Sequence, residues 1–314
     1  MKKVSPAKLL KSNPFVLAPM DDVTDIAFRK ICEDMGASYS ISELTSVDAL
    51  VRDKVTLARY ERGNLKVSGV QLFGNNPETF CEAADFVGDN ADFIDVNFGC
   101  PSATVTGNDA GSMLLKDPKN VGEIISKLVK HLDKPVTAKI RLGYSKMTYL
   151  DVAKEVEDAG AEVLAVHGRT AKQKYTGVAN WDAISEIHNG IDIPLIGNGD
   201  VRSEEDIDKY LGSHADALMI GRAAIGNPLI FEQFKHYHKT GEKLEYEDLK
   251  QRRKELFMDY LEELDKFEPY NPGLKIKRQS MWFFKGVEGV KHIRREINEG
   301  KKTIPEVLDI VKRF

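Results

Sequence analysis

Cys100 is the side chain in this sequence that is best placed to give a proton to a reacting molecule. It lies in the segment Asn-Phe-Gly-Cys-Pro at residues 97–101, between an apolar run and small polar residues, so its thiol is expected in a loop at the mouth of a site. A free thiol is mostly protonated at neutral pH and can serve as a general acid. Cys32 and Cys81 lie in amphipathic segments, where a buried and inert thiol is the usual arrangement.

Two segments that contain glycine are candidates for a phosphate-binding site. The first reads Gly-Asn-Gly-Asp at residues 197–200, and the second contains Gly221 and Arg222. Glycine lets the backbone approach an anion closely, and the guanidinium of Arg222 adds forked hydrogen-bond donors. The alternative is that these glycines only form turns, but their place after two consecutive apolar runs favours phosphate binding.

Lys139 and His167 each lie at the end of an apolar run. Lys139 is unusual in the otherwise apolar segment of residues 136–140, where its charge could face an anionic ring or reaction intermediate. The alternative for Lys139 is a lysine whose stem packs on apolar surface while its amine reaches the edge. For His167 the alternative is a hydrogen-bonded histidine of the core.

These candidates recur where short apolar runs alternate with amphipathic segments. The runs, predicted as strands, are residues 15–17, 39–41, 67–72, 93–96, 136–140, 163–166, 194–196 and 217–220. The segments predicted as helices include residues 77–87, 118–132, 149–158, 181–188 and 203–211. Eight strand–helix units in about 230 residues predict an α/β fold, the TIM (β/α)8 barrel, whose active site lies at the C-terminal ends of its strands. The absence of a GxGxxG segment argues against an open dinucleotide-binding sheet.

The sequence changes character near residue 240, after which it is charged and helical. We therefore expect a catalytic barrel at residues 1–240 and a smaller, all-helical C-terminal domain at residues 241–314. The net charge of the chain is −4, but residues 271–314 contain 11 Lys or Arg and 5 Asp or Glu, a net charge of +6. Helical spacing predicts that Arg278 and Lys285 share one face, with Lys277 nearby. This face favours a polyanionic partner, and the alternative is a solvated lysine face over an aromatic core.

Composition and cysteine usage exclude several other classes of protein. With 42% hydrophobic residues, 24 glycines and 12 prolines in 314 residues, the chain has the composition of a folded globular protein. Three scattered cysteines without a CxxC pair predict neither a disulfide framework nor a metal site. The N-terminal apolar stretch is interrupted at residues 11–14, so no membrane span or targeting segment is predicted and we expect a cytoplasmic protein.

Seven motifs in order along the chain resemble those of the tRNA-dihydrouridine synthases, flavin enzymes that reduce uridine in transfer RNA. The motifs are Ala18-Pro19-Met20, Asn97-Phe98-Gly99-Cys100-Pro101, Ala110-Gly111-Ser112, Ala138-Lys139-Ile140-Arg141, His167-Gly168-Arg169-Thr170, Gly197-Asn198-Gly199-Asp200 and Gly221-Arg222, with Gln71 between the first two. Asp21 and Asp22 differ from the small residues that commonly follow Pro-Met in the family.

The resemblance implies an FMN-dependent enzyme that takes electrons from NADPH or NADH and reduces uridine to 5,6-dihydrouridine in tRNA. A hydride adds to C6 of uracil, and Cys100 gives the proton to C5. The implied cofactor-binding residues are Pro19, Met20, Asp21, Gln71, Lys139, His167, Asn198, Gly199, Asp200, Gly221 and Arg222. The expected substrate-binding residues are Asn97, Arg169, Lys277, Arg278 and Lys285.

Two other functions are compatible with the same residues. One is a flavin-dependent reductase of a free pyrimidine or another small conjugated carbonyl compound. The other is an RNA-binding protein whose barrel has lost turnover. The basic C-terminal segment favours tRNA as the substrate, because an extruded base requires a grip on the surrounding RNA and a free base does not.

Overall fold

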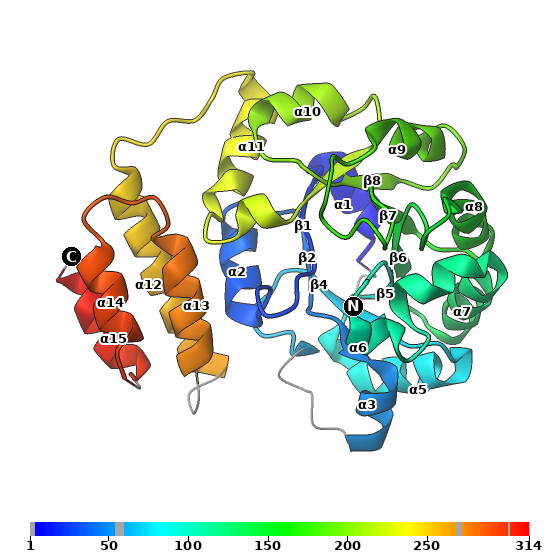
Figure 1. Cartoon of the computed structure of the whole chain (residues 1–314), viewed down its shortest axis with the longest axis horizontal. Coiled ribbons are helices and arrows are strands. Elements are labelled where there is room, and N and C mark those ends of the chain that lie inside the picture. Colours follow the sequence, from blue (N-terminus) through cyan, green and yellow to red (C-terminus); the bar gives the residue numbers. More distant parts are fainter. Residues whose placement is uncertain (1–3, 54–59, 268–271, 301, 314) are drawn as a thin grey trace.

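A closed ring of parallel strands forms the centre of the molecule (Figure 1). The computed structural model describes residues 4–53, 60–267, 272–300 and 302–313. Its strands are β1 (Phe15–Leu17), β2 (Ser40–Ile41), β3 (Thr45–Ser46), β4 (Ser68–Phe73), β5 (Phe93–Phe98), β6 (Val136–Arg141), β7 (Val163–His167), β8 (Leu195–Asn198) and β9 (Ala217–Ile220). Within the described residues the ring runs β1, β2, β4, β5, β6, β7, β8, β9, and β9 pairs with β1 to close it.

Helices surround this ring and extend to one side of it (Figure 1). Those around the ring are α1 (Pro6–Ser12), α2 (Ile26–Asp34), α3 (Val47–Asp53), α5 (Pro77–Val87), α6 (Ala103–Thr106), α7 (Pro118–His131), α8 (Tyr149–Asp158), α9 (Trp181–His188), α10 (Glu204–Tyr210) and α11 (Leu229–Thr240). Short 3-10 helices are η1 (Gly88–Asn90), η2 (Gly111–Lys116) and η3 (Arg222–Ala224). The helices at the side are α12 (Leu249–Phe267), α13 (Gly273–Phe283), α14 (Lys291–Asn298) and α15 (Ile304–Lys312).

The predicted TIM barrel with a helical C-terminal region is confirmed by this topology. Each of the eight apolar runs contains one strand of the ring, and α5, α8 and α9 begin and end where the amphipathic pattern predicted them. β3 is an additional strand of two residues that pairs with the end of β4. It is too short to produce a periodic pattern, so the sequence did not predict it.

Alternate residues of each strand face the interior of the ring, and one end of that interior is apolar. Phe93 of β5 belongs to an inner apolar cluster with Tyr39 and Val163, whereas Ile94 of the same strand belongs to the outer cluster shared with the helices. The rings of Tyr39 and Phe93 meet edge to face with centroids 5.3 Å apart. Gly69 leaves room for this pair, because a Cβ there would lie 2.3 Å from the Phe93 ring.

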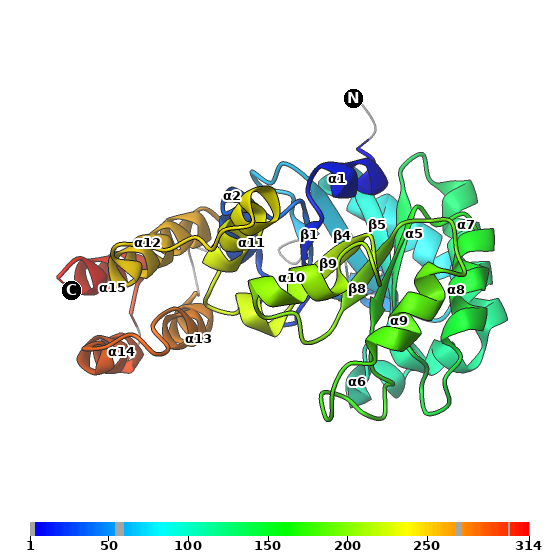
Figure 2. The same cartoon turned by 90° about the horizontal axis from the view of Figure 1, so that it is seen from above.

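Helix α1 covers the N-terminal end of the barrel (Figure 2). Leu10 belongs to the inner apolar cluster. The helix begins at Pro6 after Ser5, whose hydroxyl accepts a hydrogen bond from the backbone N–H of Lys8. Glu162, just before β7, accepts a hydrogen bond of 3.2 Å from the N–H of Ala7 and holds the helix on the barrel. The C-terminal end, which α1 leaves uncovered, carries the polar residues of the inner face.

The C-terminal helices pack on the barrel through α2. Tyr260 of α12 donates a hydrogen bond of 2.9 Å to Asp25, the residue that caps α2, and both are buried. Arg278 of α13 forms an ion pair of 2.9 Å with Asp22, in the loop after β1. The division of the chain at residue 240 stays a prediction, because α11 ends there while the outer apolar cluster continues from α2 into α12.

The basic C-terminal segment is organised differently from the single helical face that the spacing predicted. α13 ends at Phe283, so Lys285 lies in the turn after this helix and does not share its face with Arg278. Phe283 and Phe284 are fully buried, and aromatic contacts connect both rings to Phe257. These two aromatic residues therefore form core, and the exposed surface is basic. In the described part of the chain no helix is long and apolar enough to cross a membrane.

Candidate active site

The inward-facing residues nearest the C-terminal ends of the strands are polar, as the barrel prediction requires. They include most of the strand residues singled out from the sequence, and the structure brings them together around one opening. These inward-facing residues are Gln71 on β4, Asp95 and Asn97 on β5, Thr137, Lys139 and Arg141 on β6, His167 on β7 and Asn198 on β8. The ring of strands therefore supplies a polar floor for a site at its mouth.

The loop that carries Cys100 is held by the side chain of Asn97. The Asn97 carbonyl oxygen accepts hydrogen bonds from the backbone N–H groups of Gly99 at 3.1 Å and Cys100 at 2.8 Å. The thiol of Cys100 is partly exposed and lies 3.4 Å from the hydroxyl of Ser102. By contrast Cys32 and Cys81 are buried in α2 and α5, and burial raises the pKa of both thiols.

Arg141 connects the Cys100 loop to the loop after β7. Its Nε donates to the carbonyl of Gly99 at 2.8 Å, and its Nη1 donates to the carbonyls of Thr170 and Lys174. The side chain of Arg141 is buried, so these bonds replace those that water would supply. The backbone around the thiol is therefore supported from two sides, by Asn97 and by Arg141.

Lys139 lies between Asp95 and Arg141 on the inner face. Burial and then the positive charge of Arg141 lower the pKa of Lys139 to about 8, and the charge of Asp95 opposes them. The amine is therefore mostly protonated at pH 7 and loses its proton above about pH 8. A lysine in this position provides a positive charge inside the mouth at neutral pH.

His167 is neutral in this site. Burial, followed by the charges of Arg141 and Lys139, lowers the pKa of His167 well below its ordinary value. Its Nε2 lies 3.2 Å from Nη1 of Arg169, which can only donate, so Nε2 acts as the acceptor. His167 therefore presents an uncharged ring to the mouth and its proton sits on the other nitrogen.

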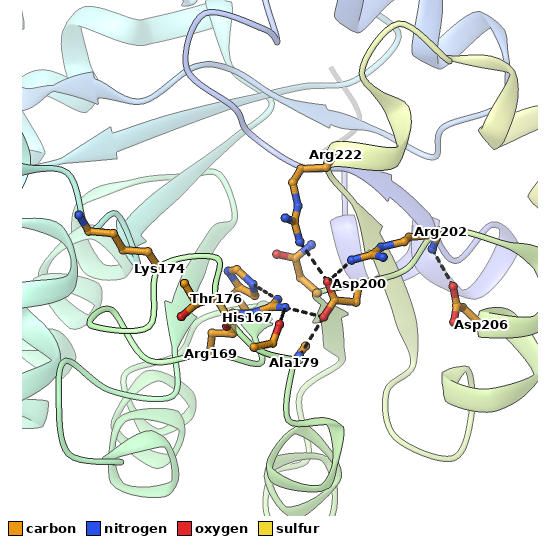
Figure 3. Close-up of polar contacts among 12 residues, drawn as sticks. His167, Arg169, Lys174, Thr176, Ala179, Asp200, Arg202, Asp206 and Arg222 are labelled. Carbon is orange, nitrogen blue, oxygen red and sulfur yellow. Dashed lines mark hydrogen bonds and ion pairs between the residues drawn. The ribbon is translucent and has the colours of Figure 1, made fainter. Parts of the chain in front are cut away.

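Asp200 gathers three arginines from three different loops (Figure 3). Its Oδ2 accepts from Arg169 at 2.6 Å and from the N–H of Ala179 at 2.9 Å, and its Oδ1 accepts from Arg202 at 2.9 Å and Arg222 at 3.0 Å. Partial burial acts to raise the pKa of Asp200, but the Ala179 and Arg169 hydrogen bonds outweigh it and the pKa is lowered. Its backbone has φ of 57°, in the left-handed region. Asp200 thus orients the arginines beside the two glycine segments.

Sequence reasoning missed Tyr175, an exposed aromatic residue of the loop after β7. Its ring lies 5.6 Å from the Arg141 guanidinium and 5.3 Å from that of Arg222, and its centroid is 6.2 Å from the His167 ring. A single tyrosine in a polar loop gives no signal in one sequence. Asp95 was also missed, although a carboxylate inside an apolar run is the same signal that identified Lys139.

The remaining predicted residues lie at the rim. Gly221 follows β9, and a Cβ there would be 3.7 Å from Ala18 and 3.8 Å from Met20, so the loops after β9 and β1 face each other. The rim after β1 consists of Pro19, Met20 and the exposed Asp21. Gly199 has φ of 127° and follows Asn198, whose amide donates to the carbonyl of Met219 at 2.7 Å. Lys277, half-buried, and Lys285, exposed, lie on the C-terminal helices beside this rim.

No group of three or more His, Cys, Asp or Glu side chains in the described ranges is arranged to hold a metal ion. The closed barrel with a partly exposed thiol, a positively charged lysine and a guanidinium cluster at its mouth defines a (β/α)8-barrel enzyme. The family model described as dihydrouridine synthase matches residues 16–312, so the chain belongs to the dihydrouridine synthase family.

Similar proteins cover nearly the whole chain. The tRNA-dihydrouridine synthase B of Pseudomonas aeruginosa is 37% identical over 309 residues, which span 96% of this chain and 93% of that protein. A probable tRNA-dihydrouridine synthase of Aquifex aeolicus is 35% identical over 91% of this chain and 92% of its own length. Among solved structures, the DHODH of Eimeria tenella in complex with ferulenol aligns with a TM-score of 0.53 and 16% identity, over 71% of this chain and 79% of that one. This structural likeness concerns the fold.

The Asp200 cluster predicts a stability effect that depends on pH. Asp200→Asn should lower the free energy of unfolding at pH 7 by about 1–2 kcal/mol, because the buried Arg169 loses a charged partner. The folded-state pKa of Asp200 is below its ordinary value, so this contribution is present above about pH 4 and is lost as the pH falls through the folded-state pKa. Urea unfolding of both proteins between pH 3 and pH 7 measures the difference.

The matched control is Arg202→Gln, which removes an exposed partner of the same carboxylate. It should cost much less than Asp200→Asn. A difference between wild type and Asp200→Asn that stayed constant down to pH 3 would contradict the assignment of this charge.

Proposed function

We propose that this chain reduces uridine to 5,6-dihydrouridine in tRNA, using FMN and a nicotinamide nucleotide. The observation that carries the proposal is the placement of Cys100, a partly exposed thiol on a hydrogen-bonded loop at the barrel mouth, in a member of the dihydrouridine synthase family. A positively charged lysine lies in the same mouth. This combination supplies an acid for a carbon atom and a cation for a ring that becomes anionic.

The residues at the mouth fit FMN by the chemistry of their donors. Lys139 is a partly buried cation suited to the polar edge of a flavin, and Arg222 is a half-exposed guanidinium beside two glycine segments and is suited to a phosphate. The space above Gly221 is open, because no atom lies within 3.4 Å of a Cβ placed there. The residues that would hold FMN are Pro19, Met20, Asp21, Gln71, Lys139, His167, Asn198, Gly199, Asp200, Gly221 and Arg222. When bound, FMN supplies the hydride that adds to C6 of uracil.

Cys100 completes the reduction by giving its thiol proton to C5. Addition of a hydride at C6 leaves an electron pair delocalised over C5 and the C4 carbonyl, and this pair takes the proton to form the new C–H bond. The thiolate that remains is close enough to Lys139 and Arg141 for their positive charges to stabilise it. Asn97 and Arg169 would contact the uridine beside it.

A uridine within tRNA must leave its stack to reach this mouth, which requires binding of the surrounding RNA. α13 and α14 lie on the same side of the molecule as α6 and the barrel mouth (Figure 2). In the part of the chain that the structure describes, Lys277 and Lys285 form no ion pair with an acidic residue, whereas Arg278 is paired with Asp22. We assign the RNA grip to this basic surface, with Lys277, Arg278 and Lys285 as its contacts.

Cys100→Ala should separate the two half-reactions. The variant should bind FMN and accept hydride from NADPH at a rate within about threefold of wild type, but should reduce uridine in unmodified tRNA at least about 100-fold more slowly. Stopped-flow absorbance of the flavin follows both steps. Cys81→Ala, which removes a buried thiol, is the control and should keep both rates.

Equal loss in both half-reactions would assign Cys100 a structural role. If a reduced wild-type enzyme transferred its electrons to free uracil and not to tRNA, the alternative function as a reductase of free pyrimidines would replace this one.

Arg222→Ala should weaken FMN binding about 10- to 100-fold, because a charge-assisted contact to phosphate is lost. Fluorescence titration of the apoprotein with FMN gives the Kd. Arg202→Ala is the matched control, since Arg202 contacts the same oxygen of Asp200 from a more exposed position. If Arg202→Ala weakened binding as much, the effect would arise from disordering Asp200 rather than from a phosphate contact.

Replacing both Lys277 and Lys285 by alanine should weaken tRNA binding and flatten its dependence on salt. Two lost phosphate contacts should reduce the slope of log affinity against log salt by about 1 to 2. The control is Lys119→Ala with Lys130→Ala, an equal charge change on α7, on the far side of the barrel (Figure 1). Affinity and slope equal to those of the control would exclude this surface as the RNA grip.

A further inference from the structure

A continuous chain of hydrogen bonds connects the buried carboxylate of Asp95 to the backbone of Cys100. Asp95 Oδ2 accepts from the side-chain amide of Gln71 at 2.6 Å. The Gln71 carbonyl oxygen accepts from the side-chain amide of Asn97 at 2.7 Å. The Asn97 carbonyl oxygen accepts from the N–H groups of Gly99 and Cys100. Asp95, which the mechanism above does not use, therefore lies at the far end of the support of the thiol loop.

The N–H groups at one end determine the direction of every bond in this chain. Because a backbone N–H can only donate, Asn97 must present its oxygen to Cys100 and its amide nitrogen to Gln71. Gln71 must then present its oxygen to Asn97 and its amide nitrogen to residue 95. An acceptor is required at that position, and an ionised carboxylate offers acceptors only.

The surroundings of Asp95 are those of a buried acceptor. Its carboxylate is 1% exposed, and its other oxygen accepts from the Thr137 hydroxyl at 2.6 Å. Burial raises the pKa of Asp95, while the hydrogen bonds from Gln71 and Thr137 and the charge of Lys139 favour the ionised form. Both carboxylate oxygens are thus occupied by donors, and no water is needed to satisfy them.

We propose that Asp95 is a positioning residue that sets the orientation of the Gln71 and Asn97 amides and through them holds the Cys100 loop in its reactive geometry. The role in uridine reduction rests on the proposed function. The effect on the loop itself does not, since it follows from the hydrogen bonds alone. Without an acceptor at residue 95, both amides can turn over, and Asn97 would then direct an N–H toward the N–H groups of Gly99 and Cys100.

The first test is Asp95→Leu, which keeps a similar size and removes the acceptor. Uridine reduction by the prereduced holoenzyme should slow about 10- to 100-fold, while NADPH-driven flavin reduction stays within about threefold. Cys100 in the protein without tRNA should react faster with iodoacetamide, measured by mass spectrometry. The control is Asp92→Asn, which removes a carboxylate that accepts from the N–H of Ser68 and pairs with Arg62, away from the thiol loop.

The second test moves the carboxylate one step along the chain. In Gln71→Glu two carboxylates face each other, so Asn97 loses its support and uridine reduction should fall. Adding Asp95→Asn restores every bond, because the new amide at position 95 would donate to the new carboxylate at position 71 and accept from Thr137. The carboxylate at position 71 would in turn accept from Asn97. The double variant should therefore reduce uridine at least about tenfold faster than Gln71→Glu, and residue 71 is the same in both.

Sign reversal of this kind supports the chain, because a merely structural role would make the two changes add. A double variant no faster than Gln71→Glu would overturn the proposal, as would an Asp95→Leu protein that behaves like Asp92→Asn in both half-reactions and in alkylation. If Asp95→Leu alters only the alkylation of Cys100 and wild type does not reduce tRNA uridine, the proposed function fails while the positioning role stands.

Discussion

Closure of the parallel strands into a ring is the constraint on which the site depends. Every second residue of each strand then faces an interior that water does not fill, so each polar side chain there must find a partner within the protein. Apolar residues such as Phe93 meet this demand at the end covered by α1. At the other end the demand produces networks, and Asp95, Asn97 and Lys139 belong to one of them. The reactive thiol can sit on a loop because its supports are on strands.

The sequence predicted the barrel well because the signal it uses is the same one that the fold imposes. Short apolar runs and amphipathic segments are direct consequences of a buried ring covered by helices, and α5, α8 and α9 matched the pattern at both ends. Partners across the ring are a different matter. Arg169 and Asp200 are separated by 31 positions, and nothing in either residue type indicates that they meet. Asp95 carried a readable signal, a charge within an apolar run, but its neighbours made the run resemble an ordinary strand.

The helical region and the mouth are joined by the loop after β1. Asp22 of this loop pairs with Arg278 of α13, and Asp25 at its end is bound by Tyr260 of α12. Met20, on the same loop, faces Gly221 across the mouth. A shift of the C-terminal helices is therefore transmitted to the residues expected beside a flavin. The polar anchors here are short-range and buried in part, so the two regions share one rigid connection rather than a flexible linker.

The neutral His167 has a consequence for how the mouth responds to acid. Most histidines gain a proton between pH 5 and pH 8, and a site built around one changes its charge with the state of the cell. Here the guanidinium of Arg169 and the neighbouring cations keep the pKa of His167 far below that interval. The imidazole adds no charge when the medium acidifies, so its attraction for an anion stays constant. His167 in this barrel is a fixed dipole, and proton concentration does not operate it as a switch.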